Sequence, residues 1–130
     1  FGCAAVALDE RRVLVAGGFD SSTTEILNVP DMAFTDGPKM ASKRAYCAGV
    51  AVDATHVLVI GGRDGSETAV ASTEILNLST MAFTPGPTKQ TARDGCAAAR
   101  LDAAGEPRIF VIGGGDEDED GEGEEEGEEY

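Results

Sequence analysis

Three short stretches of β-branched and aliphatic residues recur along the chain, and each is followed by two glycines. Stretches this short and this apolar are typical of strands that are buried on both faces. The glycine pairs mark abrupt breaks at which the chain turns. The stretches are Val13–Ala16 before Gly17 and Gly18, Val57–Ile60 before Gly61 and Gly62, and Ile109–Ile112 before Gly113 and Gly114. Their repetition predicts an array of similar units, so function is expected on the rims and loops of the array.

Other residues recur in step with the glycine pairs. Cys3, Cys47 and Cys96 each open a stretch of small residues. Further equivalent segments lie 49 residues apart: Thr24–Asn28 and Thr73–Asn77, Met32–Thr35 and Met81–Thr84, and Gly37-Pro38 and Gly86-Pro87. The glycine pairs themselves are 44 and 52 residues apart, because the connections differ in length while the strands do not. Variable connections between constant strands are expected for loops on the surface.

Each unit is predicted to contain four short strands. In the second unit these are a small-residue strand over 47–52, the aliphatic stretch, a strand over 73–78 and a strand centred on Phe83. The small side chains of Cys47-Ala48-Gly49 suit a strand with close neighbours on both sides, as is found for the innermost strand of a propeller blade. No stretch has the periodicity of a helix. The predicted fold class is therefore all-β.

These features resemble the kelch repeat family, in which a glycine pair is followed by Glu-x-aromatic-Asp and then by a further aromatic residue. The glycine pairs are intact over the whole match, which covers residues 2 to 114. Glu25 and Glu74 match the glutamate, Phe34 and Phe83 stand where Trp is usual, Leu27 and Leu76 replace the Tyr, and Asn28 and Asn77 replace the Asp. The resemblance implies a β-propeller of four-stranded antiparallel blades, which is usually a platform for binding.

The repeats account for about two and a half blades. We expect blade 1 over about 2–36, blade 2 over about 44–85 and half of blade 3 over about 95–114. Propellers have about four to eight blades, so these units would form an open, partial propeller. The sequence begins at Phe1, without Met, where a preceding fourth strand is expected. We therefore expect the chain to be part of a longer protein or an incomplete gene model.

Acidic residues are concentrated at the C-terminal end. Residues 116–130 contain eleven acidic residues and no basic ones, in a chain whose net charge is −14. The segment 115–130 cannot bury enough surface to offset its conformational entropy, so we predict an acidic disordered tail. It is interpreted as a solubilising terminus, as an arm for basic partners such as histones or polybasic segments, or as a loose calcium site. The negative charge argues against nucleic-acid binding.

The three cysteines and the hydropathy bear on the compartment. Cys3, Cys47 and Cys96 lie next to small residues in the expected inner strands, which predicts buried thiols that act as small hydrophobic groups. Equivalent cysteines in different blades are not expected to meet the geometry of a disulfide. A reducing compartment such as the cytoplasm is therefore favoured. No apolar stretch is long enough to suggest a membrane partner.

Residues that carry chemistry are scarce. The chain has one histidine, His56, which lies at the expected start of a strand and has no evident catalytic partners. Copper oxidases with kelch-like propellers draw on two Tyr and two His ligands, whereas this chain offers His56, Tyr46 and Tyr130. We expect no enzyme activity, metal or cofactor. The expected function is a protein–protein interaction module, for example a ubiquitin-ligase adaptor or scaffold. The alternative is the non-catalytic part of a secreted oxidase or carbohydrate-active propeller.

Two equivalent arginines are the candidate partner-binding residues. Arg44 and Arg93 each precede a cysteine by three positions, at the start of an expected inner strand. The resemblance to kelch adaptors implies that this position can face the central binding surface and contact acidic side chains, for which the planar guanidinium is well suited. The competing interpretation is an ion pair with Glu25 or Glu74 that stabilises the blade.

Overall fold

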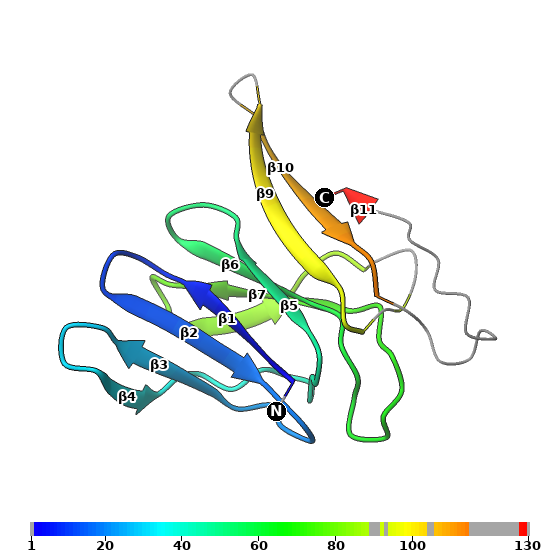
Figure 1. Cartoon of the computed structure of the whole chain (residues 1–130), viewed down its shortest axis with the longest axis horizontal. Helices are drawn as coiled ribbons and strands as arrows, with labels where there is room; N and C mark the ends of the chain where they lie inside the picture. Colours follow the sequence, from blue (N-terminus) through cyan, green and yellow to red (C-terminus); the bar gives the residue numbers. More distant parts are fainter. Residues whose placement is uncertain (1, 89–91, 93, 104–105, 115–127, 130) are drawn as a thin grey trace.

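The computed structural model folds into three antiparallel sheets that lie next to one another (Figure 1). It describes residues 2–88, 92, 94–103, 106–114 and 128–129. Within these ranges every regular element is a strand, so the predicted all-β fold class is confirmed. The sheets do not close into a ring, in agreement with an open, partial propeller.

The first two sheets each contain four strands in sequence order, and we call them blade 1 and blade 2. Blade 1 consists of β1 (Cys3–Ala7), β2 (Arg12–Gly17), β3 (Thr24–Asn28) and β4 (Ala33–Asp36). Blade 2 consists of β5 (Ala48–Ala51), β6 (His56–Ile60), β7 (Thr73–Asn77) and β8 (Ala82–Pro85). Each strand pairs antiparallel with the next, so both predicted units form a four-stranded meander.

The third sheet, which we call blade 3, differs in its outer part. It contains β9 (Ala97–Ala103), β10 (Glu106–Ile112) and β11 (Glu128–Glu129), in the order β11-β10-β9. β9 and β10 form a long hairpin that extends beyond the other two blades (Figure 1).

Most of the segment predicted as a disordered tail lies outside the described residues. Its last part differs from that prediction, because Glu128 and Glu129 form β11 and pair with Val111 and Phe110 of β10. The prediction relied on side-chain composition, whereas a strand edge pairs through its backbone groups. β11 covers the outer edge of β10. The equivalent edge is covered by β3 in blade 1 and by β7 in blade 2.

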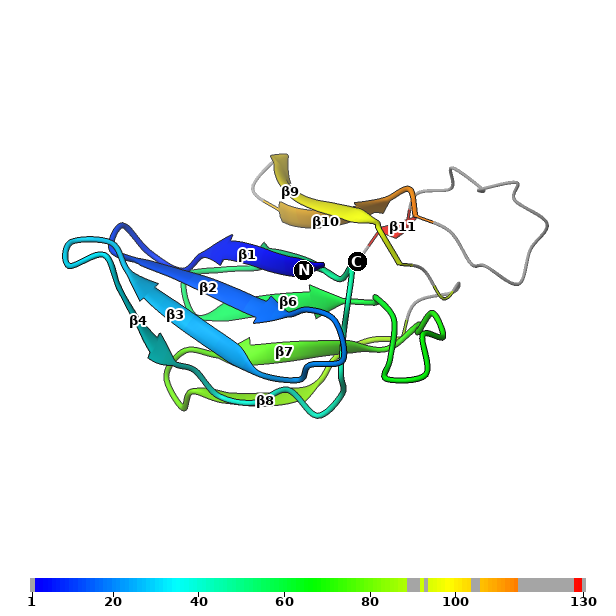
Figure 2. The same cartoon turned by 60° about the horizontal axis from the view of Figure 1, so that its bottom comes forward.

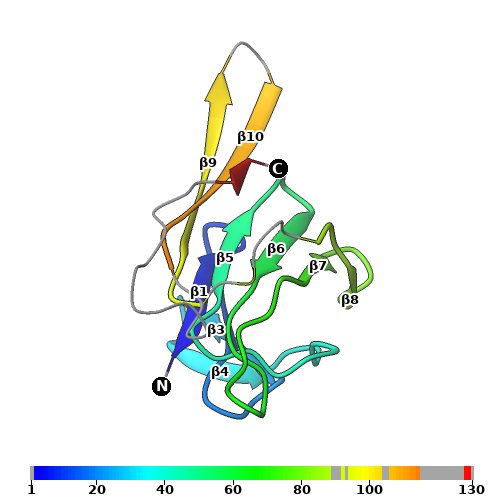
Figure 3. The same ribbon diagram turned by 90° about the vertical axis from the view of Figure 1, so that its right-hand side faces the viewer.

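The innermost strands of the three blades lie side by side. β5 contacts β1 on one side and β9 on the other, as Figure 3 shows. Figure 2 shows blades 1 and 2 next to each other, with the β9–β10 hairpin beyond β1 and β6. Residues of blades 1 and 2 share one hydrophobic core, and residues of β5 and β6 share another with β9 and β10. Blade 2 is therefore covered on both faces.

Residues of β6 alternate between two hydrophobic cores. Val57 and Val59 pack against blade 1, whereas Leu58 and Ile60 pack against blade 3. All four side chains are at most 3% exposed. An aliphatic stretch without polar residues is what a strand needs when both of its faces are buried.

The glycine pairs have the backbone conformation that their sequence pattern predicts. All six glycines that end β2, β6 and β10 have positive φ, between 62° and 119°, which other residues rarely adopt. Several also lie against a neighbouring backbone. A Cβ atom on Gly62 would be 2.6 Å from the carbonyl oxygen of Ala45, and one on Gly17 would overlap the carbonyl oxygen of Arg44.

The residue before each cysteine also has a positive φ, and these residues link the blades through their backbones. They are Gly2 (77°), Tyr46 (57°) and Gly95 (66°). The N–H of Tyr46 donates to the carbonyl oxygen of Gly2 at 2.5 Å, and the N–H of Gly95 donates to that of Tyr46 at 2.8 Å. Each hydrogen bond runs from one blade to the blade before it.

Arg44 lies in the connection from β4 to β5 and is almost completely buried, with 1% of its surface exposed. Its Nε donates to Oε2 of Glu74 at 2.9 Å. The other guanidinium nitrogens donate to the carbonyl oxygens of Gly61 and Ser72, at 3.0 and 2.8 Å, and to the Ser72 hydroxyl at 2.9 Å. Its own carbonyl oxygen accepts a hydrogen bond from Gly18 at 2.8 Å. Arg44 therefore joins blade 1 to β7 and to the two ends of the β6–β7 loop in blade 2.

Glu74 fixes the connection that carries Arg44. Its carboxylate also accepts hydrogen bonds from the backbone N–H groups of Ala41 and Ser42, at 2.5 and 3.4 Å. Glu25, the equivalent residue of blade 1, is exposed and does not pair with Arg44. Arg44 thus follows the interpretation in which the arginine stabilises the blade, and Arg93 lies outside the described residues.

Two equivalent glycines allow the energetic cost of the close backbone contact at Gly17 to be measured. Gly17 and Gly113 have nearly the same φ, 75° and 77°, but a Cβ on Gly113 would meet no atom of the described residues within 4 Å. Both replacements by alanine carry the strain of the left-handed conformation, ~1–2 kcal/mol. Only Gly17→Ala adds an overlap with a backbone oxygen, which costs a further ~1–3 kcal/mol. Urea denaturation should show the larger loss for Gly17→Ala; equal losses would contradict the close approach.

Breaking the buried ion pair of Arg44 should lower the free energy of unfolding far more than breaking the surface ion pair of Lys43, its neighbour in the sequence. Arg44→Met keeps the apolar stem but leaves the Glu74 carboxylate buried without its cation, so we expect the free energy of unfolding to fall by ~3–5 kcal/mol. Lys43 pairs with Asp20 at 2.8 Å on the surface, and Lys43→Ala should cost at most ~1 kcal/mol. Thermal denaturation measures both changes. Similar losses for the two variants would show that the buried pair does not hold the connection.

Candidate functional site

Three connections gather at one end of the blades, at the lower edge of Figure 1. They are the β2–β3 loop (18–23), the β6–β7 loop (61–72) and the β4–β5 connection (37–47). Ala45 and Arg63 form an antiparallel bridge that ties the last two together. We call this end of the molecule the loop face.

Arg44, one of the two predicted partner-binding residues, is not exposed on this face. The residue does lie at the start of an inner strand, but its guanidinium is buried and already donates to three residues of blade 2. A ligand could reach it only if the connection opened. The exposed part of the loop face is formed by residues that the sequence analysis did not select.

Arg63 is the first of these residues and follows the glycine pair of blade 2. Its Nε forms an ion pair with Oδ2 of Asp94, which lies just before β9. Its guanidinium also lies 5.7 Å from the centroid of the Tyr46 ring, within the range of a cation–π interaction. Arg63 therefore links the β6–β7 loop to blade 3 across the ring of Tyr46.

Tyr46 is the second residue that sequence reasoning missed. Its φ of 57° is unfavourable for a bulky side chain, and the equivalent positions of the other two repeats carry Gly2 and Gly95. The side chain is 39% exposed. Strained residues of this kind cluster at functional sites. Its departure from glycine at a repeated position is the signal that could have identified it from the sequence.

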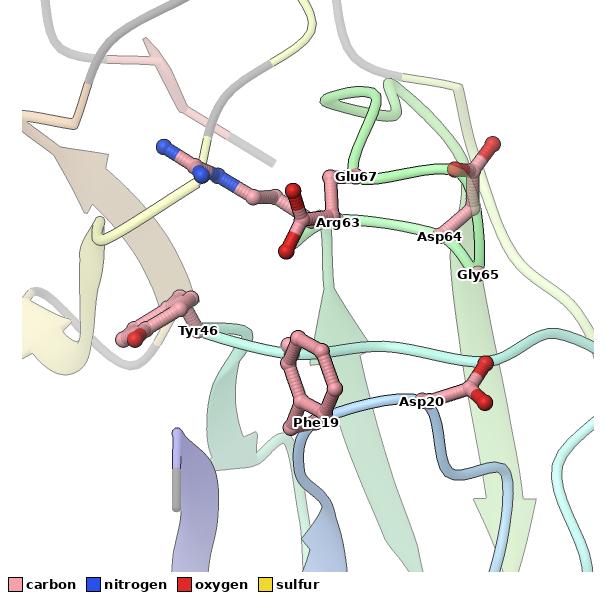
Figure 4. Close-up of a pocket in the computed structure, with 8 residues that line it drawn as sticks. Phe19, Asp20, Tyr46, Arg63, Asp64, Gly65 and Glu67 are labelled. Atoms are coloured by element: carbon pink, nitrogen blue, oxygen red, sulfur yellow. The ribbon is translucent and has the colours of Figure 1, made fainter.

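Tyr46, Arg63 and Phe19 surround a small surface pocket of about 160 Å³ (Figure 4). Phe19 occupies the same place after the glycine pair of blade 1 that Arg63 occupies in blade 2, and it is 52% exposed. The charged lining residues are Asp20, Arg63, Asp64 and Glu67. We call this cavity the aromatic pocket. It combines two exposed aromatic rings with charged groups on the loop face.

Cysteine and carboxylate side chains outside the aromatic pocket have structural roles. Burial raises the pKa of the Cys47 thiol to about 11, so at neutral pH it is not the thiolate that nucleophilic chemistry requires. Cys3 is exposed and Cys96 half-buried, so the prediction of buried thiols holds only for Cys47, which packs between blades 1 and 2. At the opposite rim, hydrogen bonds from the Thr55 amide and the His56 ring lower the pKa of Asp53 to about 2.

Two further features hold for the described ranges. Their His, Cys, Asp and Glu side chains form no group of three that could hold a metal ion. They also contain no helix with the length and apolar character needed to cross a membrane.

A comparison with known families identifies the repeat. The family model of the Kelch motif matches residues 44–90, which include Arg44, Tyr46, Arg63 and all four strands of blade 2. No curated protein matches the chain. Kelch repeats generally form modules for protein–protein interaction. The matched motif, together with its second copy in blade 1 and the antiparallel blades, supports the assignment of these repeats to the kelch repeat family.

Proposed function

We propose that the chain is a non-catalytic protein-interaction module whose binding surface is the loop face. The observation that carries this proposal is the aromatic pocket, in which Phe19 and Tyr46 expose large parts of their rings next to charged groups. Tyrosine, tryptophan and arginine are enriched among residues that dominate binding energy at interfaces. Tyr46 and Arg63 are residues of this kind.

The pocket is well supported by the fold. Arg63 is fixed by Asp94, and the backbone of Tyr46 is hydrogen-bonded to blades 1 and 3. A binding residue held by such contacts loses little conformational entropy when a partner docks. Arg44, which is held by its buried ion pair with Glu74, lies two residues before Tyr46 in the chain.

The opposite rim is less suited to recognition. The β1–β2 and β5–β6 turns are short, and Asp9 and Asp53 are occupied in accepting hydrogen bonds from their own turns. Asp9 also pairs with Arg12 at 2.9 Å. These carboxylates therefore stabilise turns.

Within this function, we favour a scaffold or adaptor, such as the substrate-binding part of a ubiquitin ligase. The described lining of the aromatic pocket contains carboxylates and an arginine but no Cys, His or Ser side chain that could act as a nucleophile or a titrating base near neutral pH. This composition supports binding over catalysis. An interaction domain in the parent protein would support the adaptor role, whereas a signal peptide with His and Tyr ligands would support the oxidase alternative.

A selection of peptides displayed on phage against the whole chain tests the binding surface. We expect Tyr46→Gly to weaken the selected peptides by at least ~10-fold, because it removes an aromatic side chain from the pocket. Glycine is the residue that the same backbone position carries in the other repeats, so the fold should be kept. Leu101→Ala is the control, because Leu101 is 53% exposed on β9 outside the pocket. Peptides that bind both variants as well as the original chain would place the binding surface elsewhere.

A further inference from the structure

The aromatic pocket carries an excess of negative charge. Three of its lining residues, Asp20, Asp64 and Glu67, are acidic, and Arg63 is its one basic lining residue among those described. The charge of Arg63 is already matched by Asp94, and that of Asp20 by Lys43. Asp64 and Glu67 remain without a cationic partner in the described part of the chain.

These two acids differ in what they can offer a ligand. Oδ1 of Asp64 accepts hydrogen bonds from the backbone N–H groups of Ser66 and Thr68, at 2.8 and 3.1 Å, and so shapes its own loop. Glu67 is exposed, and Figure 4 shows its carboxylate directed into the space between Arg63, Tyr46 and Phe19. Glu67 is therefore the acid that is placed to meet a ligand.

The rings complete a site for a cation. The guanidinium of Arg63 lies over the Tyr46 ring, so the chain itself provides an example of a cation that packs on this side chain. Phe19 offers a second exposed ring at the same cavity. Aromatic faces attract ammonium and guanidinium groups, and a nearby carboxylate adds a direct ion pair.

We propose that the aromatic pocket receives a single Lys or Arg side chain from a basic segment of the partner protein, with Glu67 as its counterion. The proposal rests on the binding function proposed above and specifies the chemistry of the partner. A volume of about 160 Å³ suits one side chain, since pockets for whole small-molecule ligands are larger, ~300–1,000 Å³. The net charge of −14 also attracts a basic partner over longer distances.

The peptides selected on the chain test this chemistry. We expect them to share a Lys or Arg, and its replacement by Gln should weaken binding by ~10-fold. Glu67→Gln should weaken the basic peptide by a similar factor but leave the Gln-containing peptide unaffected, because the two changes remove the same ion pair. The control is Glu10→Gln, which makes the same change of charge at an exposed position of the β1–β2 turn. It should have little effect.

The outcomes separate this proposal from the proposed function. Peptides that depend on Tyr46 but share no basic residue would overturn the choice of partner and leave the binding surface in place. A basic peptide that Glu67→Gln and Glu10→Gln weaken equally would show long-range attraction without a site at Glu67. Binding that is independent of Tyr46 would overturn both proposals.

A second inference comes from the strand registers and does not depend on the pocket. In blade 1, Glu25 lies opposite Val15, and in blade 2, Glu74 lies opposite Val59. Each valine is two residues before the first glycine of its pair. In blade 3 the equivalent valine is Val111, and the residue opposite it is Glu128. The three glutamates therefore hold the same register in the three blades.

We infer that β11 is the third strand of blade 3 and that Glu128 takes the position of Glu74. In sequence, Glu128-Glu129-Tyr130 also fits the Glu-x-aromatic pattern of the repeat.

Hydrogen exchange of the amides in β10 tests this assignment. Glu128→Pro should speed exchange over residues 108–112 by at least ~5-fold, because proline disfavours the paired strand that covers this edge. Glu126→Pro, two residues earlier in the acidic run, should change it little. Equal effects of Glu128→Pro and Glu126→Pro would overturn the inference.

Discussion

The buried ion pair between Arg44 and Glu74 determines how the two complete blades are joined. A polar group without a partner is costly in a protein interior, and an unpaired charge is costlier still. Here the guanidinium has four acceptors, and the carboxylate has two further backbone donors. These hydrogen bonds hold the chain between β4 and β5 in its path across the end of blade 2. That path fixes where Tyr46 emerges, and with it the aromatic pocket.

The sequence predicted those parts of the fold that depend on local pattern. The aliphatic stretch of β6 and its glycine pair could be assigned from residue types, because burial on both faces and positive φ each restrict the residues that fit. Arg44 could be found as a repeated residue, but its role depends on whether a neighbouring segment covers it, which periodicity does not show. The pairing of Glu128 was missed because composition describes a whole segment and not the single backbone edge beside it.

The pocket was harder to predict because it is where the repeats differ. Phe19 and Arg63 are equivalent in sequence but have different chemistry, and Tyr46 replaces a glycine. Residues that recur in every repeat are those that build the blade. Positions that differ between repeats are therefore not identified by comparing the repeats. A binding surface needs individual residues, and the loop face supplies them on a framework that is otherwise the same from blade to blade.

The hydrogen bonds from Tyr46 to Gly2 and from Gly95 to Tyr46 give the assembly a direction. Blade 2 presents a donor to blade 1 and an acceptor to blade 3, so its two sides are different and complementary. Contacts of this head-to-tail type are heterologous, and they build rings when the rotation between units closes. The order of the blades therefore has a polarity. It is set by backbone hydrogen bonds and does not depend on the side chains that each blade carries.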